Sequence, residues 1–318
     1  MHSLSNQVDG STDGSAWSPL DFYSYRQFYP ATPEIGALVR ADASGEFIRA
    51  WKDVGASRLT FCGHREAIGT SFVLVRGLFG RWIPKHFAAT RKALARAGLR
   101  SIIANSRAAG TVDANAALIG RDIEARVHPE HKLVFLCHSK GGLDTLAMLL
   151  RFPALRRRTG AVVLCQTPRA ACAVLESVLL DRHRDSIVRK GRDVKEAMAR
   201  QAIFWSGARP GCLELTGDRI SQRISGIDAS PFNLPVLAVA SWSVEPTAWL
   251  DSQHARLGQI RPRCAHDGLF YLEDLLWPEA EQILLPRIDH SQPTVGGAGF
   301  DNGRFWIALA AMALDRIK

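Results

Sequence analysis

Long hydrophobic runs are absent from this 318-residue chain, and no apolar stretch approaches the roughly 20 residues that a helix needs to cross a bilayer. Residues 1–19 are polar and rich in Ser, Gly and Asp, without the apolar core of a secretory signal. We interpret them as a disordered N-terminal arm. One large soluble domain is expected over residues 20–318, because 47% of the side chains are hydrophobic and 22% are charged.

Cysteine is sparse, with six residues, and none of them forms a C-x-x-C pair. Cys137 and Cys165 each end an apolar run, which is typical of buried thiols. The spacing therefore favours free thiols in a reducing compartment over a disulfide framework. From this pattern we expect a cytoplasmic protein.

The sequence also lacks zinc-knuckle spacing and a basic stripe interleaved with aromatic residues, so it does not indicate specific nucleic-acid recognition. Its formal net charge is nevertheless +9, from 40 Lys and Arg against 31 Asp and Glu. Part of the excess lies in residues 151–158 and 182–192. We interpret these runs as solvated helix faces. The alternative is that they form a basic face that contacts an anionic membrane or polymer surface.

Internal repeats are absent too, and the chain instead alternates short apolar runs with segments of helical periodicity. The apolar runs predict buried strands at residues 71–77, 99–105, 132–137, 160–166 and 234–242, and a last strand ending near Ile288. Helical spacing predicts helices at residues 84–97, 113–127, 141–152 and 302–317. This alternation indicates the α/β class, with a mostly parallel central sheet flanked by helices. Residues 168–230 are helical and basic without a clear strand, and we interpret them as an insertion.

The segment Cys137-His138-Ser139-Lys140-Gly141 lies between a predicted strand and a predicted helix. It resembles the nucleophile elbow G-x-S-x-G, in which a serine on a strained turn exposes its oxygen above the sheet. Cysteine replaces the first glycine and is small enough to keep the helix close to the strand. The helix that begins beside Ser139 directs its positive end toward any anion formed there. The alternative is a serine that only caps the helix.

A nucleophilic serine requires a base, which a carboxylate orients. In this architecture the acid and then the base follow the serine along the chain. His290 lies in the loop after the last predicted strand, where such a base is expected, although His183, His254 and His266 remain possible.

For the acid we favour Asp267, in an Asp-Gly turn 23 residues before His290. Glu245 and Asp251, just after the strand at 234–242, are rivals, and an ordinary turn is the structural alternative. Asp289 adjoins His290 and is too close to orient its imidazole without strain.

An oxyanion intermediate also needs hydrogen-bond donors. One is expected from the backbone N–H of Lys140, directly after the nucleophile. The other is expected from Leu78, or else from Phe79, because Gly77 lets the chain turn sharply after the strand at 71–77.

These features together resemble the α/β-hydrolase superfamily, particularly its bacterial lipase-like and esterase-like members. The matching segments are FVLVRGLFG, VFLCHSKGGLD, AVASW and HDGLFYLEDLLWPEAEQILLPRIDHSQPTV. The resemblance implies Ser139 as nucleophile, Asp267 as acid and His290 as base, with the insertion in the place of a cap or lid. Many relatives have His-Gly where this chain has Arg76-Gly77.

In this arrangement Phe79, Trp82 and Trp242 would line or rim the substrate pocket, although aromatic residues at such positions often belong to the core. The expected activity is hydrolysis of small-molecule or lipid-like carboxylic esters through an acyl-enzyme, without a metal or an organic cofactor. Thioesters, amides, lactones or polyesters are alternative substrates of the same three residues. A different class of function is an interaction protein that uses a hydrolase scaffold and its basic face.

Overall fold

The computed structural model of the chain describes residues 39, 41–57, 61, 65–180, 192–228, 233–243 and 251–317. The predicted arm at residues 1–19 lies outside these ranges. No helix among the described residues is both long enough and apolar enough to span a membrane.

A six-stranded parallel sheet forms the centre of the described structure, with the strand order β2-β1-β3-β4-β5-β6. The strands are β1 Thr70–Val75, β2 Ser101–Ile103, β3 Lys132–His138, β4 Thr159–Cys165, β5 Val236–Trp242 and β6 Glu281–Pro286. The register pairs Val75 with Cys137 and His138 with Cys165, so β1, β3 and β4 end at the same edge of the sheet. Reactive groups of parallel sheets collect at this carboxyl edge.

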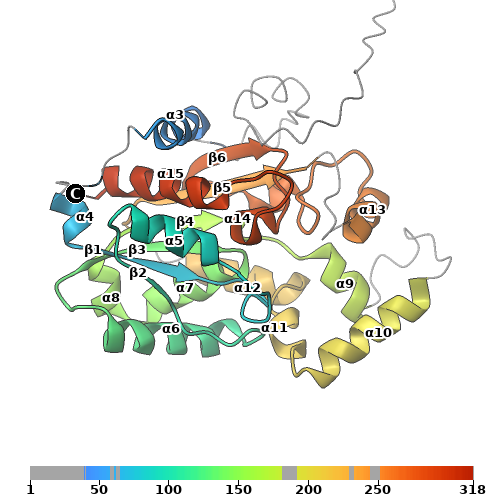
Figure 1. Cartoon of the computed structure of the whole chain (residues 1–318). Helices are drawn as coiled ribbons and strands as arrows, with labels where there is room; N and C mark the ends of the chain where they lie inside the picture. Colours follow the sequence, from blue (N-terminus) through green and yellow to red (C-terminus); the bar gives the residue numbers. More distant parts are fainter. Residues whose placement is uncertain are drawn as a thin grey trace, which may run out of the picture.

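Helices cover both faces of the sheet, and this explains why its strands are almost uninterrupted apolar runs. In β3, Phe135 and Cys137 pack on one face, and Val134 and Leu136 pack on the other. The first face is covered by α6 Val112–Arg126, α7 Lys140–Arg151 and α8 Pro153–Arg158, and the second by α3 Ser44–Gly55, α5 Ala88–Arg96 and α15 Asn302–Asp315. Figure 1 shows the sheet between these two layers.

The predicted strands and helices are confirmed, with ends shifted by a few residues. Helix α3 is an element that the sequence analysis missed. Its residues Phe47, Ile48 and Trp51 are buried against α15, and a hydrogen bond from Ala43 N to Gln282 O attaches its start to β6. Three short elements complete the framework: α4 Arg65–Ile68, the 3₁₀ helix Leu272–Leu275 and α14 Gln292–Val295.

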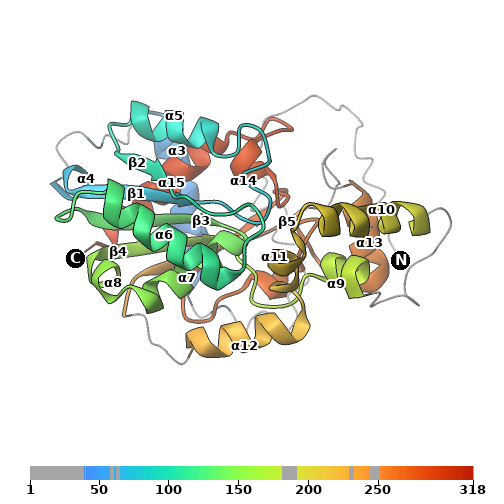
Figure 2. The ribbon, with the colours of Figure 1, turned by 90° about the horizontal axis from the view of Figure 1, so that it is seen from below.

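Helices fill the described part of the segment between β4 and β5, as predicted for residues 168–230. They are α9 Ala173–Leu180, α10 Arg192–Trp205, α11 Arg209–Leu213 and α12 Gly217–Asp228. Both ribbon views place α9 and α10 at one end of the molecule, together with α13 Asp251–Ile260 (Figures 1 and 2). We refer to α9–α12 as the insertion.

The structure describes the basic run at residues 151–158 but only one residue of the run at 182–192. Arg151 and Arg157, at the end of α7 and on α8, are exposed, in line with a solvated helix face. Arg158 instead donates hydrogen bonds to the carbonyls of His128 and His131. The run at residues 182–192 lies outside the described residues except for Arg192, at the start of α10.

Candidate active site

Ser139 occupies the turn between β3, which ends at His138, and α7, which begins at Lys140. Its backbone has φ 54° and ψ −134°, in the left-handed region that a non-glycine residue rarely adopts. The N–H of Ser139 donates a 2.8 Å hydrogen bond to the carbonyl of Cys165 at the end of β4. The turn is therefore strained, and the neighbouring strand holds it in place.

Two glycines are required because the elbow and the loop after β1 nearly touch. A Cβ at Gly141 would lie 2.6 Å from the carbonyl oxygens of both Val75 and Arg76. A Cβ at Gly77 would lie 2.8 Å from the Cβ of Ser139. Only a residue without a side chain fits at either position.

The cysteine that replaces the first motif glycine is accommodated in the core. Cys137 is fully buried, and its thiol donates to Thr145 Oγ1 at 3.2 Å, under the first turns of α7. Burial raises the pKa of this thiol to about 12, so it stays protonated and is a poor nucleophile.

The structure brings Ser139, His290 and Asp267 into one chain of hydrogen bonds. The Ser139 hydroxyl lies 2.8 Å from His290 Nε2, and His290 Nδ1 lies 2.7 Å from Asp267 Oδ2. The backbone N–H of His290 also donates to the carbonyl of Asp267 at 2.8 Å. If Nδ1 carries the proton and donates it to the carboxylate, the lone pair of Nε2 faces the hydroxyl, which is the arrangement that a general base needs.

The carboxylate of Asp267 is fixed by its own turn. Its Oδ1 accepts hydrogen bonds from the N–H groups of Leu269 and Phe270 at 2.9 and 2.8 Å, and the residue is fully buried. The ring of Phe270 packs 5.2 Å from that of His290, a contact that the sequence analysis did not foresee.

The alternatives to His290 as base and to Asp267 as acid either have other partners or lie outside the described residues. Asp289 accepts hydrogen bonds from Ser291 and from the N–H of Gln292, so it caps α14. His266 packs 4.6 Å from His254, and its Nδ1 accepts the N–H of Gly268. His183, Glu245 and the side chain of Asp251 are outside the described residues.

A second histidine, His138, holds the backbone of His290 in place. His138 donates from Nε2 to the carbonyl of His290 at 2.8 Å, and Gln166 Oε1 lies 3.2 Å from the same nitrogen. Gln166 in turn donates to Ser241 Oγ and to the carbonyl of Asp289. Burial keeps the pKa of His138 well below its ordinary value, so this imidazole is neutral. The network anchors the loop that carries His290.

The loop after β1 presents the second candidate donor. The N–H of Phe79 donates to the carbonyl of Ala108 at 2.6 Å and is therefore occupied, whereas the N–H of Leu78 has no acceptor among the described residues. The N–H of Lys140 belongs to the first turn of α7, where backbone donors lack a partner within the helix. Of the two alternatives in this loop, the geometry favours Leu78.

Asn115 on α6 connects the segment at 107–108, which accepts the N–H of Phe79, to α7. Its side chain accepts the N–H of Arg107 at 2.9 Å, donates to the Arg107 carbonyl at 3.2 Å, and donates to Asp144 Oδ2 at 2.8 Å. Asp144 also forms a fully buried ion pair with Lys140, with Nζ 2.6 Å from Oδ1. Burial, the largest effect, raises the pKa of Asp144 to about 6, although Lys140 opposes it. The side chain of Lys140 thus points into the core.

Asn115→Ala is expected to lower kcat for ester hydrolysis about tenfold with little change in KM. The substitution releases the 107–108 segment that holds Phe79, and losing an oxyanion donor outright costs about 10²–10³ in kcat. Steady-state kinetics with a chromogenic ester measure this. Asn105→Ala is the matched control, because the Asn105 side chain is exposed and, among the described residues, accepts only from Arg81. Equal kinetic effects of the two variants would contradict the proposed support.

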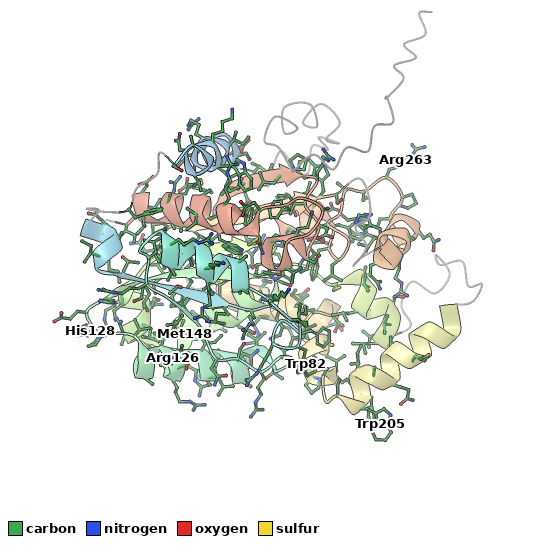
Figure 3. All side chains as sticks on the ribbon, in the orientation of Figure 1. Trp82, Arg126, His128, Met148, Trp205 and Arg263 are labelled. Carbon is green, nitrogen blue, oxygen red and sulfur yellow. The ribbon has the colours of Figure 1, made fainter. Side chains whose placement is uncertain are left out.

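The three aromatic residues predicted at the pocket differ in their exposure. Phe79 is half-buried and stacks on Trp82, with ring centroids 5.5 Å apart and planes 19° apart. Trp82 is 53% exposed and extends from the loop between β1 and α5 (Figure 3). Trp242 is buried at the end of β5 and belongs to the core cluster on the α6–α7 face. Phe79 and Trp82 are thus the accessible pair.

No group of three or more His, Cys, Asp or Glu side chains within the described ranges is arranged to hold a metal ion. No protein-family model and no curated protein sequence matches this chain.

Solved structures do resemble it. A carboxyl esterase of metagenomic origin is 20% identical, with a TM-score of 0.61 over 78% of this chain and 76% of that protein. A Bacillus licheniformis lipase in its mature form is 14% identical, with a TM-score of 0.58 over 77% of this chain and 92% of the lipase. These structures share the parallel sheet flanked by helices. The chain has the α/β-hydrolase fold.

Proposed function

We propose that this protein is a serine hydrolase that cleaves carboxylic esters through an acyl-enzyme. The observation that carries the proposal is the chain of hydrogen bonds from the Ser139 hydroxyl through His290 to the buried carboxylate of Asp267. A hydroxyl on a strained turn, a base within 2.8 Å and an acid that orients the base are together what nucleophilic catalysis by serine requires.

In the first half of the reaction, Ser139 Oγ attacks the ester carbonyl carbon and its proton passes to His290 Nε2. The carbonyl electron pair moves onto oxygen, where the N–H groups of Lys140 and Leu78 stabilise the negative charge. When the tetrahedral intermediate collapses, the bond to the alcohol oxygen breaks and His290 returns the proton to that oxygen. The acyl group remains on Ser139.

In the second half, a water molecule gives one proton to His290 while its oxygen attacks the acyl carbon. The bond to Ser139 Oγ then breaks, and the serine regains the proton from His290. Asp267 keeps its negative charge throughout and stabilises the imidazolium that forms twice in the cycle.

The carboxylic ester is the preferred substrate class because the two similar structures are described as a carboxyl esterase and a lipase. We further propose that the insertion α9–α12 covers part of the substrate pocket, next to Phe79 and Trp82. The alternatives on the same residues are thioesters, amides, lactones and polyesters. A non-catalytic interaction protein would have no use for a strained serine held against an imidazole.

A matched set of butyryl ester, thioester and anilide substrates tests the proposal. We expect ester turnover that falls to background in Ser139→Ala. Acid quenching during turnover is expected to trap a butyryl group on the peptide that contains Ser139, detected by mass spectrometry. Turnover that survives in Ser139→Ala, or a set in which only the anilide is cleaved, would contradict the proposal.

A further inference from the structure

Arg76 lies one residue beyond β1 and borders the nucleophile turn. Its carbonyl oxygen lies 2.6 Å from the position of a Cβ on Gly141, and its neighbour Gly77 packs against Ser139. The backbone of residues 76 and 77 therefore packs directly against the turn that carries Ser139.

The side chain of Arg76 starts on the face of the sheet that α5 covers. The alternating strand residues Phe72 and Leu74 pack on that face. A Cβ at Gly80 would lie 3.0 Å from Arg76 Cβ and 2.9 Å from His86 Nε2, so these two side chains flank Gly80 together.

Three neighbouring imidazole rings lead from His86, beside Arg76, to the candidate base His290. The ring of His86 lies 5.8 Å from the ring of His138, which lies 4.9 Å from the ring of His290. His86 and His138 are both more than nine-tenths buried, and the Nδ1 atom of each has no hydrogen-bond partner among the described residues. Buried polar atoms without a described partner thus lie beside the candidate site.

The positive charge of Arg76 is not neutralised by any described residue. Its Nε is buried without a hydrogen-bond partner, and its guanidinium forms no ion pair within the described ranges. Burial, followed by repulsion from Arg81 and Arg91, lowers the pKa of Arg76. Burial, and then the charges of Arg76 and His290, lower the pKa of His86 to about 3. An anion is the group that this environment lacks.

Two other half-buried arginines of the protein are neutralised by acidic side chains. Arg223 makes two hydrogen bonds to Asp113, at 2.8 and 3.0 Å, and a third to Glu214. Arg316 pairs in the same way with Glu46 and Glu281. Arg76 differs from these two in having no acidic partner among the described residues, and a half-buried cation without one is costly. An anionic ligand beside the nucleophile would offset that cost.

We infer that Arg76, with His86 beside it, binds a carboxylate of the substrate, so that the preferred esters carry a free carboxylate near the scissile bond. The inference rests on the proposed function, since it concerns the substrate of that site. A guanidinium binds a carboxylate through two parallel hydrogen bonds, which a lysine in its place would not provide. The formal net charge of +9 adds a general attraction for such anions.

Two matched pairs of esters test this inference. In the first pair, the p-nitrophenyl monoester of glutaric acid is compared with its analogue methylated at the distal carboxyl. In the second, 4-butyryloxybenzoate is compared with its methyl ester, which moves the carboxylate to the leaving group. The wild-type protein is expected to favour the carboxylate member of one pair by about tenfold or more in kcat/KM.

The Arg76→Gln variant is expected to lower that preference at least about tenfold, and Arg76→Lys to lower it less. Arg91→Gln, which removes an exposed arginine acting on Arg76, is the matched control and is expected to change it less than about threefold. A preference for the methylated member of both pairs would overturn the inference. So would equal losses in Arg76→Gln and Arg91→Gln, which would indicate only diffuse attraction.

A binding measurement separates this inference from the proposed hydrolysis. Calorimetric titration of monomethyl glutarate into Ser139→Ala is expected to give binding that weakens at least about tenfold when Arg76→Gln is added. If no ester is cleaved but this dependence on Arg76 is found, the proposed reaction fails and the carboxylate site stands. If esters are cleaved and binding is absent or independent of Arg76, the carboxylate site fails alone.

Discussion

Replacing Asp267 with Asn is expected to lower kcat for ester hydrolysis by about 10⁴-fold, with little change in KM. The carboxylate lies 2.7 Å from His290 Nδ1 and fixes which nitrogen of the imidazole carries the proton. A carboxamide at this position can donate to Nδ1 and so stabilise the tautomer in which Nε2 is protonated. In that tautomer Nε2 cannot accept the proton of Ser139. Steady-state kinetics of the purified variant measure kcat and KM. Thermal unfolding checks that the variant is folded.

Asp289→Asn is the matched control for this substitution. Asp289 adjoins the same histidine, but its carboxylate caps α14. Its replacement is expected to lower kcat by less than about tenfold, because asparagine also serves as a cap. Glu245→Gln should likewise matter little. A large loss in Glu245→Gln together with a small one in Asp267→Asn would assign the acid to the segment after β5.

Gly77→Ala is expected to reduce kcat by about 10²–10³-fold, the effect of removing one oxyanion donor. A methyl group at Gly77 would lie 2.8 Å from Ser139 Cβ and 3.0 Å from the carbonyl of His138, so the loop or the elbow must shift. The shift moves the N–H of Leu78 away from the place where the oxyanion forms. Affinity for a trifluoromethyl ketone, which mimics the tetrahedral intermediate, is expected to fall in parallel with kcat/KM.

The control is Gly226→Ala in α12, where a Cβ would meet no atom within 4 Å. Alanine is expected to leave kcat unchanged there and to stabilise the helix by about 0.5–1 kcal/mol. If Gly77→Ala retained full activity, the loop after β1 would not carry the second oxyanion donor.

The sequence predicted those parts of the fold in which the local pattern of apolar residues matches their burial in the folded protein. The strands buried on both faces are uninterrupted apolar runs, so β1, β3 and β4 could be placed within a few residues. Ser139 could be singled out because a tight turn between a strand and a helix needs small residues on both sides of it. Helix α3 was missed although Phe47, Ile48 and Trp51 have helical spacing, because Ala43 at its N-cap supplies no capping side chain to signal the start of a helix.

The parts of the candidate site that were missed depend on contacts between distant residues. His138 supports a carbonyl 152 positions away, and no local pattern signals that bond. The elbow motif predicts a role only for the backbone N–H of Lys140, whereas Asp144 at i+4 has the spacing of a helical ion pair and indicates a partner for its side chain. That Arg76 has no acidic partner among the described residues became visible only once the neighbours of β1 were known.

Labelling by a fluorophosphonate probe, followed by mass-spectrometric mapping of the modified residue, tests the central claim most directly. The probe forms a covalent bond only with a serine whose hydroxyl is activated and accessible. Our account predicts stoichiometric modification at Ser139, lost in Ser139→Ala and strongly slowed in His290→Ala. An unmodified protein, or modification at another residue that persists in Ser139→Ala, would contradict it.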